Sequence, residues 1–178
     1  MKVQSSIIIP IANKAEGIHQ FAFHLDPTFF DAFEESKIKE GKWDVNVILE
    51  KRVGHMSLLL EGKGSILVSC DRCLEEFRMP LDFANDLLVK YAEEDKQDEV
   101  DILYVSKDQQ ELDLSALIYE FIHLCIPLVS MHEMAGLECD PKMLELLDQA
   151  APEEEVSEEE NAKNPIWDVL KDIDLGNK

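Results

Sequence analysis

The stretch from Val45 to Cys70, VNVILEKRVGHMSLLLEGKGSILVSC, decides the fold of this chain of 178 residues. Its first part has apolar residues at every second position, Val53-Gly54-His55 interrupts the pattern, and the alternation then resumes. A period of two on both sides of a glycine-containing break is typical of two antiparallel strands. The residues that carry this period are Val45, Val47, Leu49, Met56, Leu58 and Leu60.

The alternation continues beyond Gly62-Lys63-Gly64 and leads to a pair of cysteines. The run from Ile66 to Cys70 again has period two, and a further run of the same kind follows from Phe77 to Phe83. Each run indicates a strand with one apolar face. Cys70 and Cys73 are therefore predicted to lie at the tip between two strands.

Three aspartates mark the starts of helices. Asp26 and Asp140 each precede a proline, which is the order expected for an N-cap and the first helical residue. Asp113 precedes an apolar stripe that runs to Leu124 and ends before Pro127. We therefore expect a short helix within the strand-rich half and two helices after it.

These elements together predict an α+β fold, with an antiparallel β-sheet in the N-terminal half and helices in the C-terminal half. The domain is expected to cover residues 1–149. Residues 150–163 contain six glutamates and a proline, too polar to bury a core, and are predicted to be an acidic disordered linker. Residues 164–178 restart an apolar pattern at helical spacing and are predicted to form a short C-terminal helix.

The composition bounds the class of protein. A hydrophobic content of 46% fits a folded domain. The longest apolar run, Ile7 to Ala12, is interrupted by Pro10 and is far shorter than the roughly 18 residues of a spanning helix. No secretory signal pattern is present, so we expect a cytoplasmic protein without membrane contact. In a reducing compartment its four cysteines are expected to be metal ligands or core thiols.

The negative charge is concentrated in the second half of the chain. The net charge is −21, yet residues 37–78 carry eight Lys/Arg and seven Asp/Glu, whereas residues 79–178 carry seven and twenty-six. The acidic half suits solubility or a basic protein partner. RNA contact requires cations, and we assign it to the near-neutral sheet region. Its candidate contacts are Lys51, Arg52, Lys63, Arg72 and Arg78.

Four residues form a candidate structural zinc site. Cys70, Cys73, His132 and Cys139 supply three thiols and one imidazole, the closed tetrahedral set that structural zinc prefers. The alternative is that the thiols are reduced and weakly packed and that His132 is an ordinary loop residue. Cys125 falls within the helical stripe and is interpreted as a core thiol.

No catalytic motif accompanies these residues. The chain has no glycine-rich phosphate loop, nucleophile elbow or His-Glu-x-x-His helix, so a binding protein is favoured over an enzyme with a small-molecule substrate. A thiol oxidoreductase would place Cys70 at a helix N-terminus, where the helix dipole lowers its pKa. Strand-like sequence on both sides argues against that reading.

The cysteine pair also carries a family resemblance. Cys70-Asp71-Arg72-Cys73-Leu74 resembles the Cys-x-Arg-Cys-Leu signature of the bacterial YceD family, the large ribosomal RNA subunit accumulation proteins. Three further segments are similar in order: a helix from Leu112 through Glu120, its exit at Ile126-Pro127-Leu128, and Asn164-Pro165-Ile166-Trp167 near the end. Many relatives carry a second cysteine cluster after the proline, where this chain offers His132 and Cys139.

This resemblance implies a noncatalytic ribosome-biogenesis factor that supports accumulation of 23S ribosomal RNA and large-subunit assembly. A basic ribosomal protein or assembly factor, or a pre-ribosomal particle, is the expected partner. The predicted terminal helix carries Ile166, Trp167 and Leu170. These side chains either form a contact surface for that partner or pack against the domain. A zinc-stabilised protein-interaction adaptor unrelated to ribosomes and a thiol oxidoreductase remain as rival functions.

Overall fold

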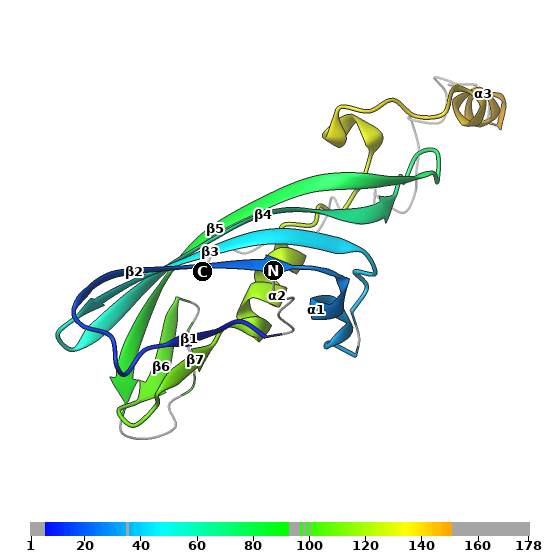
Figure 1. The fold of residues 1–178 in the computed structure, drawn as a ribbon. Coiled ribbons are helices and arrows are strands. Elements are labelled where there is room, and N and C mark those ends of the chain that lie inside the picture. The colour runs from blue at the N-terminus through cyan, green and yellow to red at the C-terminus, as the bar shows by residue number, and fades with distance from the viewer. Residues whose placement is uncertain (1–5, 35, 93–96, 98, 100, 151–178) are drawn as a thin grey trace, which may run out of the picture. The chain divides into compact units, whose positions relative to one another are not determined.

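The computed structural model describes residues 6–34, 36–92, 97, 99 and 101–150 (Figure 1). The chain divides into two compact units, residues 1–144 and residues 145–178. Within the described residues, the strands all lie in the first unit. Ala150, predicted to begin the linker, is instead the last residue of helix α3 (Pro141–Ala150). The rest of the predicted linker and the whole predicted terminal helix lie outside the described residues.

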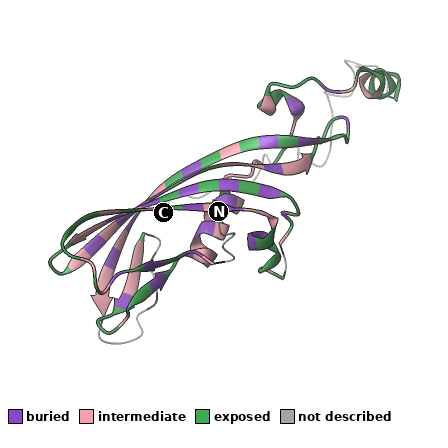
Figure 2. Ribbon diagram, in the orientation of Figure 1, coloured by how far each residue is buried: buried purple, intermediate pink, exposed green. Residues whose placement is uncertain are grey.

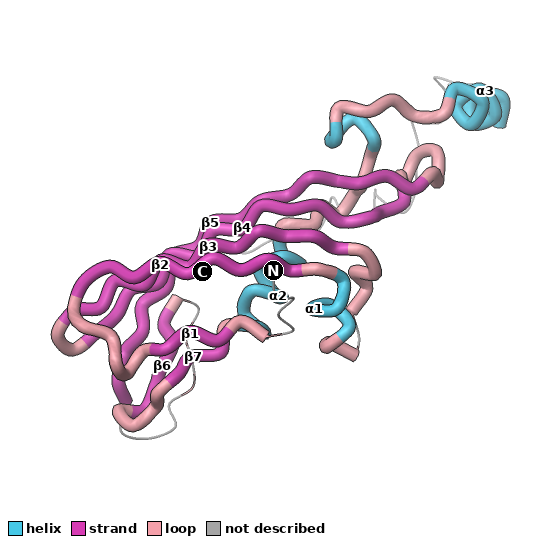
Figure 3. The backbone as a smooth tube through the Cα atoms, viewed as in Figure 1, coloured by secondary structure: helices cyan, strands magenta, loops and turns pink. Residues whose placement is uncertain are grey.

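A five-stranded sheet in the order β2-β3-β4-β5-β6 forms the first unit's main layer (Figure 3). Its strands are β2 (Gly17–Leu25), β3 (Gly41–Arg52), β4 (His55–Ser69), β5 (Glu76–Ala92) and β6 (Ile102–Ser106). Strands β2 to β5 pair antiparallel, which confirms the predicted α+β class with its antiparallel N-terminal sheet. Strand β6 pairs parallel to β5, with Leu103 opposite Val89. That mixed edge was not predicted.

The alternating sequence pattern becomes a sheet with one buried face. Val47 and Leu49 on β3 and Leu60 on β4 are completely buried, while Lys42 and Lys63 on the other face are exposed. Figure 2 shows the resulting alternation of buried and exposed residues along the long strands. Because successive side chains of a strand point to opposite faces, burial of one face imposes this period.

Strand β4 continues without a break through Gly62 and Gly64, where the sequence places two glycines close together. Gly62 lies opposite Phe83 of β5 and Gly64 lies opposite Trp43 of β3. A Cβ on either glycine would overlap the facing aromatic ring. The glycines therefore give two large rings room to lie across the strand, and the ring centroids of Trp43 and Phe83 are 5.7 Å apart.

Helices α1 (Pro27–Asp31) and α2 (Ser115–Leu124) lie on the same side of the sheet (Figures 1 and 3). The side chain of Asp26 accepts a hydrogen bond from the Thr28 backbone N–H at 2.9 Å, as predicted for an N-cap. In α2 the buried residues are Ile118 and Ile122, whereas Leu124 is 79% exposed. The prediction that the buried stripe reaches Leu124 was wrong, because the inward face follows a spacing of four residues.

A small second sheet pairs β1 (Ile8–Pro10) with β7 (Glu111–Asp113), and the sequence did not predict it. The apolar run that contains Pro10 was too short and irregular to signal a strand by itself. Its residues Ile7, Ile9 and Ile11 are buried in the same core as the main sheet. None of the helices in the described part of the chain is long and apolar enough to cross a membrane.

Candidate metal centre

Cys70 and Cys73 lie in the turn that joins β4 to β5, at the predicted strand tip. The Leu74 backbone N–H donates to the Cys70 carbonyl at 2.8 Å, and the Cys70 N–H donates to the Glu75 carbonyl at 2.9 Å. These two bonds close a tight loop around the cysteines. Both thiols point inward, since Cys70 is 0% and Cys73 is 3% exposed.

The other two candidate ligands come from a segment about sixty residues later. His132 begins the short 3-10 helix η1 (His132–Ala135), and Cys139 lies in the loop before α3. Gly136 has a left-handed φ of 69° and ends η1, and the Leu137 N–H donates to the His132 carbonyl at 3.0 Å. This reversal carries the chain back so that His132 and Cys139 face the same point.

Asp71 joins the two halves. Its backbone N–H donates to the Ser130 carbonyl at 2.8 Å, and its carboxylate accepts from the Ser130 N–H at 2.6 Å. The next residue, Arg72, lies 3.5 Å from the Glu133 carboxylate in an exposed ion pair. The Phe77 ring packs against the His132 ring at 4.5 Å between centroids. The two residues between the cysteines thus both contact the later segment.

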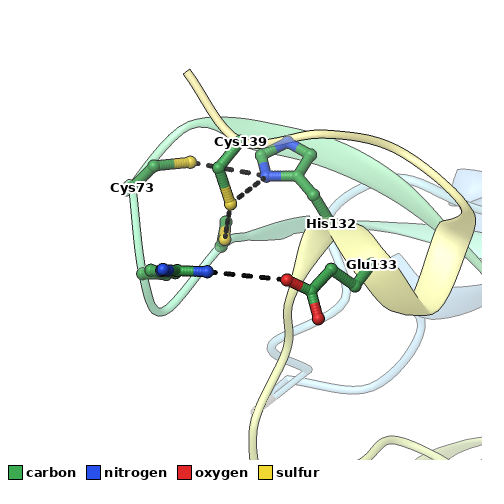
Figure 4. Close-up of polar contacts among 6 residues, drawn as sticks. Cys73, His132, Glu133 and Cys139 are labelled. Atoms are coloured by element: carbon green, nitrogen blue, oxygen red, sulfur yellow. Dashed lines mark hydrogen bonds and ion pairs between the residues drawn. The ribbon is translucent and has the colours of Figure 1, made fainter. Parts of the chain in front are cut away.

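The four candidate ligand atoms all lie within 4.8 Å of one another (Figure 4). The Sγ atoms of Cys70 and Cys139 are 3.7 Å apart, and Nδ1 of His132 lies 3.4 Å from Cys73 Sγ and 3.6 Å from Cys139 Sγ. Tetrahedral zinc, with Zn–S of about 2.3 Å and Zn–N of about 2.0 Å, separates two sulfurs by about 3.8 Å and sulfur from nitrogen by about 3.5 Å. The donor set and its spacing therefore fit a zinc ion.

The local environment favours a thiolate at Cys70. Burial acts to raise its pKa, but backbone hydrogen bonds from Cys73, Arg72 and His132 outweigh burial and lower the pKa to about 6. At Cys139, burial and the neighbouring thiols Cys70 and Cys73 raise the pKa to about 11. Several thiolates in one pocket repel one another, and a dication removes that repulsion.

A redox role does not suit the same pair. A lowered pKa at Cys70 is typical of a reactive thiol, but a nucleophilic cysteine must also reach its substrate. Cys70 and Cys73 are buried, and sequence on both sides forms strands β4 and β5 rather than a helix. All four donors of the cluster come from the chain, so a metal ion held there has no open position for a substrate.

Cys125 and His123 lie apart from the cluster. Cys125 is half-buried at the end of α2, its Sγ donates to the Ile122 carbonyl at 3.1 Å, and burial raises its pKa. It resembles an inert packing thiol. His123 is also half-buried, with its ring 4.1 Å from that of Tyr119.

Most of the five cations predicted to contact RNA have partners within the chain. Lys51 Nζ donates to the backbone carbonyls of Ile11 and Ala12 at 2.7 and 3.1 Å, so it secures the chain after β1. The acidic partners are Glu50 for Arg52, Glu133 for Arg72 and Glu40 for Arg78. Lys63 is exposed on β4, with Asp44 and Asp82 opposite it on the neighbouring strands. RNA contact through these side chains stays a prediction.

The predicted partner-binding residues Ile166, Trp167 and Leu170 lie outside the described residues. Sequence reasoning also missed the groups that hold the cluster in place, namely Asp71, Ser130 and Phe77. An aspartate within the cysteine pair was the available signal, because short acidic side chains readily accept from nearby backbone N–H groups.

Replacing Asp71 with alanine is expected to lower zinc affinity about 10- to 100-fold, because outer groups that orient ligands contribute on that scale. The variant loses the carboxylate that holds Ser130, two residues before His132. Competition with a chromophoric chelator measures the effect. Arg72→Ala is the matched control, since its exposed ion pair contributes little. Equal zinc affinity for Asp71→Ala and the wild type would show that the ligand halves come together without this contact.

Residues 60–174 match the model of a protein family described as large ribosomal RNA subunit accumulation protein YceD. The matched range includes the cysteine turn, α2 and all four candidate ligands. Among curated proteins and solved structures, none matches the chain.

Proposed function

Since this chain belongs to the YceD family of large ribosomal RNA subunit accumulation proteins, we propose that it supports accumulation of 23S ribosomal RNA as a noncatalytic assembly factor. The family match over residues 60–174 is the observation that carries this proposal. Under it, the protein acts by binding a component of the growing large subunit.

A zinc ion would be held by Cys70, Cys73, His132 and Cys139. When bound, it supplies a rigid cross-link and no reactive position, because the chain fills its coordination shell. The chain itself provides the rest: Asp71 holds the two ligand-bearing segments together and Phe77 packs on the imidazole. The cluster thus supports a stable binding surface, which is what an assembly factor requires.

A basic protein is the partner best suited to the charge of this chain. The chain carries a net charge of −21 and residues 79–178 hold twenty-six acidic residues against seven basic ones. Lysine-rich ribosomal proteins or assembly factors complement such a negative charge, whereas it repels phosphates. Three of the five candidate RNA-contacting cations face glutamates, which further favours protein over RNA.

Deleting the gene in its host is expected to lower 23S relative to 16S ribosomal RNA, and returning the wild-type gene is expected to restore the ratio. The physical reason is that unassembled ribosomal RNA is left exposed to nucleases when large-subunit assembly stalls. Quantitative electrophoresis of total RNA measures the ratio. Return of a gene that encodes the Cys125→Ala variant, in place of the wild-type gene, serves as a control. An unchanged 23S to 16S ratio in the deletion strain would contradict the proposed function.

The rival function is a zinc-stabilised adaptor unrelated to ribosomes. The buried four-donor cluster suits that function equally well, because it stabilises a surface without specifying its partner. Sedimentation of the tagged protein separates the two: an assembly factor migrates with large-subunit precursors, and an unrelated adaptor stays in the light fractions.

A further inference from the structure

Leu74 occupies a backbone conformation and an environment that both disfavour leucine. It follows Cys73 in the turn, its φ is 64°, and it is the only non-glycine residue with positive φ among those that the structure describes. Its side chain is 71% exposed. Asparagine or glycine adopts this left-handed conformation at lower cost, and an exposed leucine gains little from burial. The side chain of Leu74 therefore does not stabilise the turn.

Other exposed apolar side chains lie in the segments that carry the candidate ligands. We define the metal lobe as residues 70–76 and 128–140, which contain all four ligands. Met134 lies two residues after His132 and is 50% exposed. Leu137 lies two residues before Cys139 and is 47% exposed. Leu128 and Val129, at the start of the lobe's second segment, are also exposed. Five large apolar side chains of the metal lobe are thus at least 47% exposed, and exposed apolar surface of this kind is typical of interaction sites.

The metal lobe is also acidic. It contains six Asp/Glu and a single arginine, Arg72. Among the residues that the structure describes, Glu75, Glu76 and Glu138 have no cation within ion-pair distance, whereas Glu133 faces Arg72. Three thiolates more than neutralise a zinc dication, so the bound metal would not offset this charge. The apolar side chains are thus accompanied by uncompensated negative charge.

We propose that the metal lobe is the docking surface for a basic protein segment, with Leu74 as its apolar anchor. The segment presents apolar side chains to Leu74, Met134 and Leu137, and its lysines or arginines lie beside Glu75, Glu76 and Glu138. A few buried anchor residues supply most of the binding energy of an interface, and complementary charges guide association and register. The inference rests on the proposed function for the partner's class, and it adds the surface and the residues.

The test uses the full-length, zinc-loaded chain immobilised on a resin. The probe is the protein fraction extracted from purified large ribosomal subunits and freed of RNA by nuclease, with purified large-subunit ribosomal RNA applied separately. Leu74→Asn removes the apolar side chain and suits the left-handed backbone. Val53→Asn is the matched control, because Val53 is 80% exposed and lies in the turn between β3 and β4, at the opposite end of β4.

Wild type and Val53→Asn are expected to retain lysine- and arginine-rich subunit proteins, and Leu74→Asn is expected to retain at least about tenfold less. The melting temperature of Leu74→Asn is expected to equal or exceed that of wild type, which a structural role for Leu74 would not allow. Equal retention by Leu74→Asn, no retention by wild type, or a Leu74-dependent capture of RNA instead of protein would each overturn the docking surface. The 23S to 16S ratio in the deletion strain judges the proposed function independently of these outcomes.

Discussion

Cys73→Ala is expected to reduce bound zinc from about one ion per chain to none. Cys73 Sγ lies 3.4 Å from His132 Nδ1, within the four-donor cluster. Structural zinc has an apparent binding free energy on the order of 10 kcal/mol in small domains. The variant keeps only three of the four donors, so water must take the fourth coordination position and the binding free energy falls. Inductively coupled plasma mass spectrometry of protein purified under reducing conditions measures the ratio. Wild-type protein without zinc would refute the assignment of the site.

Loss of zinc should loosen the metal lobe without unfolding the sheet. The core of the sheet depends on buried apolar residues such as Val47, Leu49 and Leu60 rather than on the cluster. Hydrogen exchange of Cys73→Ala is therefore expected to increase in residues 70–76 and 128–140 and to stay low in β3 and β4. Cys125→Ala is the matched control, because this half-buried thiol lies outside the cluster. It should keep its zinc and its exchange pattern.

Trp43→Ala is expected to destabilise the domain by about 3–5 kcal/mol, the range found when a buried large aromatic side chain is truncated. Trp43 is 1% exposed and lies across Gly64 beside the Phe83 ring. The facing residue, Gly64, has no side chain that could fill the space that alanine would leave. The free energy of unfolding from urea titration, followed by circular dichroism, measures the loss. A change below about 1 kcal/mol would indicate that this part of the core repacks freely.

Trp43→Phe tests whether the ring or the indole N–H matters. The Nε1 of Trp43 is buried and has no hydrogen-bond partner among the described residues. Phenylalanine keeps much of the aromatic contact and removes a donor whose burial without a partner is unfavourable. The cost should therefore be below about 2 kcal/mol, well under that of alanine. Equal destabilisation by both variants would point to a specific role for the indole.

Strands β3, β4 and β5 of the main sheet were predictable because each repeats the same local pattern. Val45, Val47 and Leu49 and their counterparts on β4 alternate through a complete strand, and a single glycine turn joins the two strands. The pairing of β1 with β7 was not predictable, since three-residue strands contain too few alternations. The parallel pairing of β6 with β5 could not be predicted from the sequence for another reason. Its direction depends on how the chain returns to the sheet rather than on the residues of the strand itself.

For the candidate site, the sequence predicted the four donor residues but not the contacts that hold them in place. Three thiols and one imidazole suggested Cys70, Cys73, His132 and Cys139 before any geometry was known. Lys51 shows the opposite case. It counted as a free cation in the sequence, but its amine binds the carbonyls of Ile11 and Ala12, forty residues away along the chain.

The sequence by itself determined the antiparallel strands, the position of the cysteine pair at a strand tip and the family. These features depend on residues that are neighbours along the chain, where the period of a strand and the spacing of a motif are directly visible. Only the tertiary structure decided that His132 and Cys139 meet the cysteine turn, and that Asp71 joins the two segments. Such contacts depend on the path of the chain between distant segments, and local side-chain preferences do not specify that path.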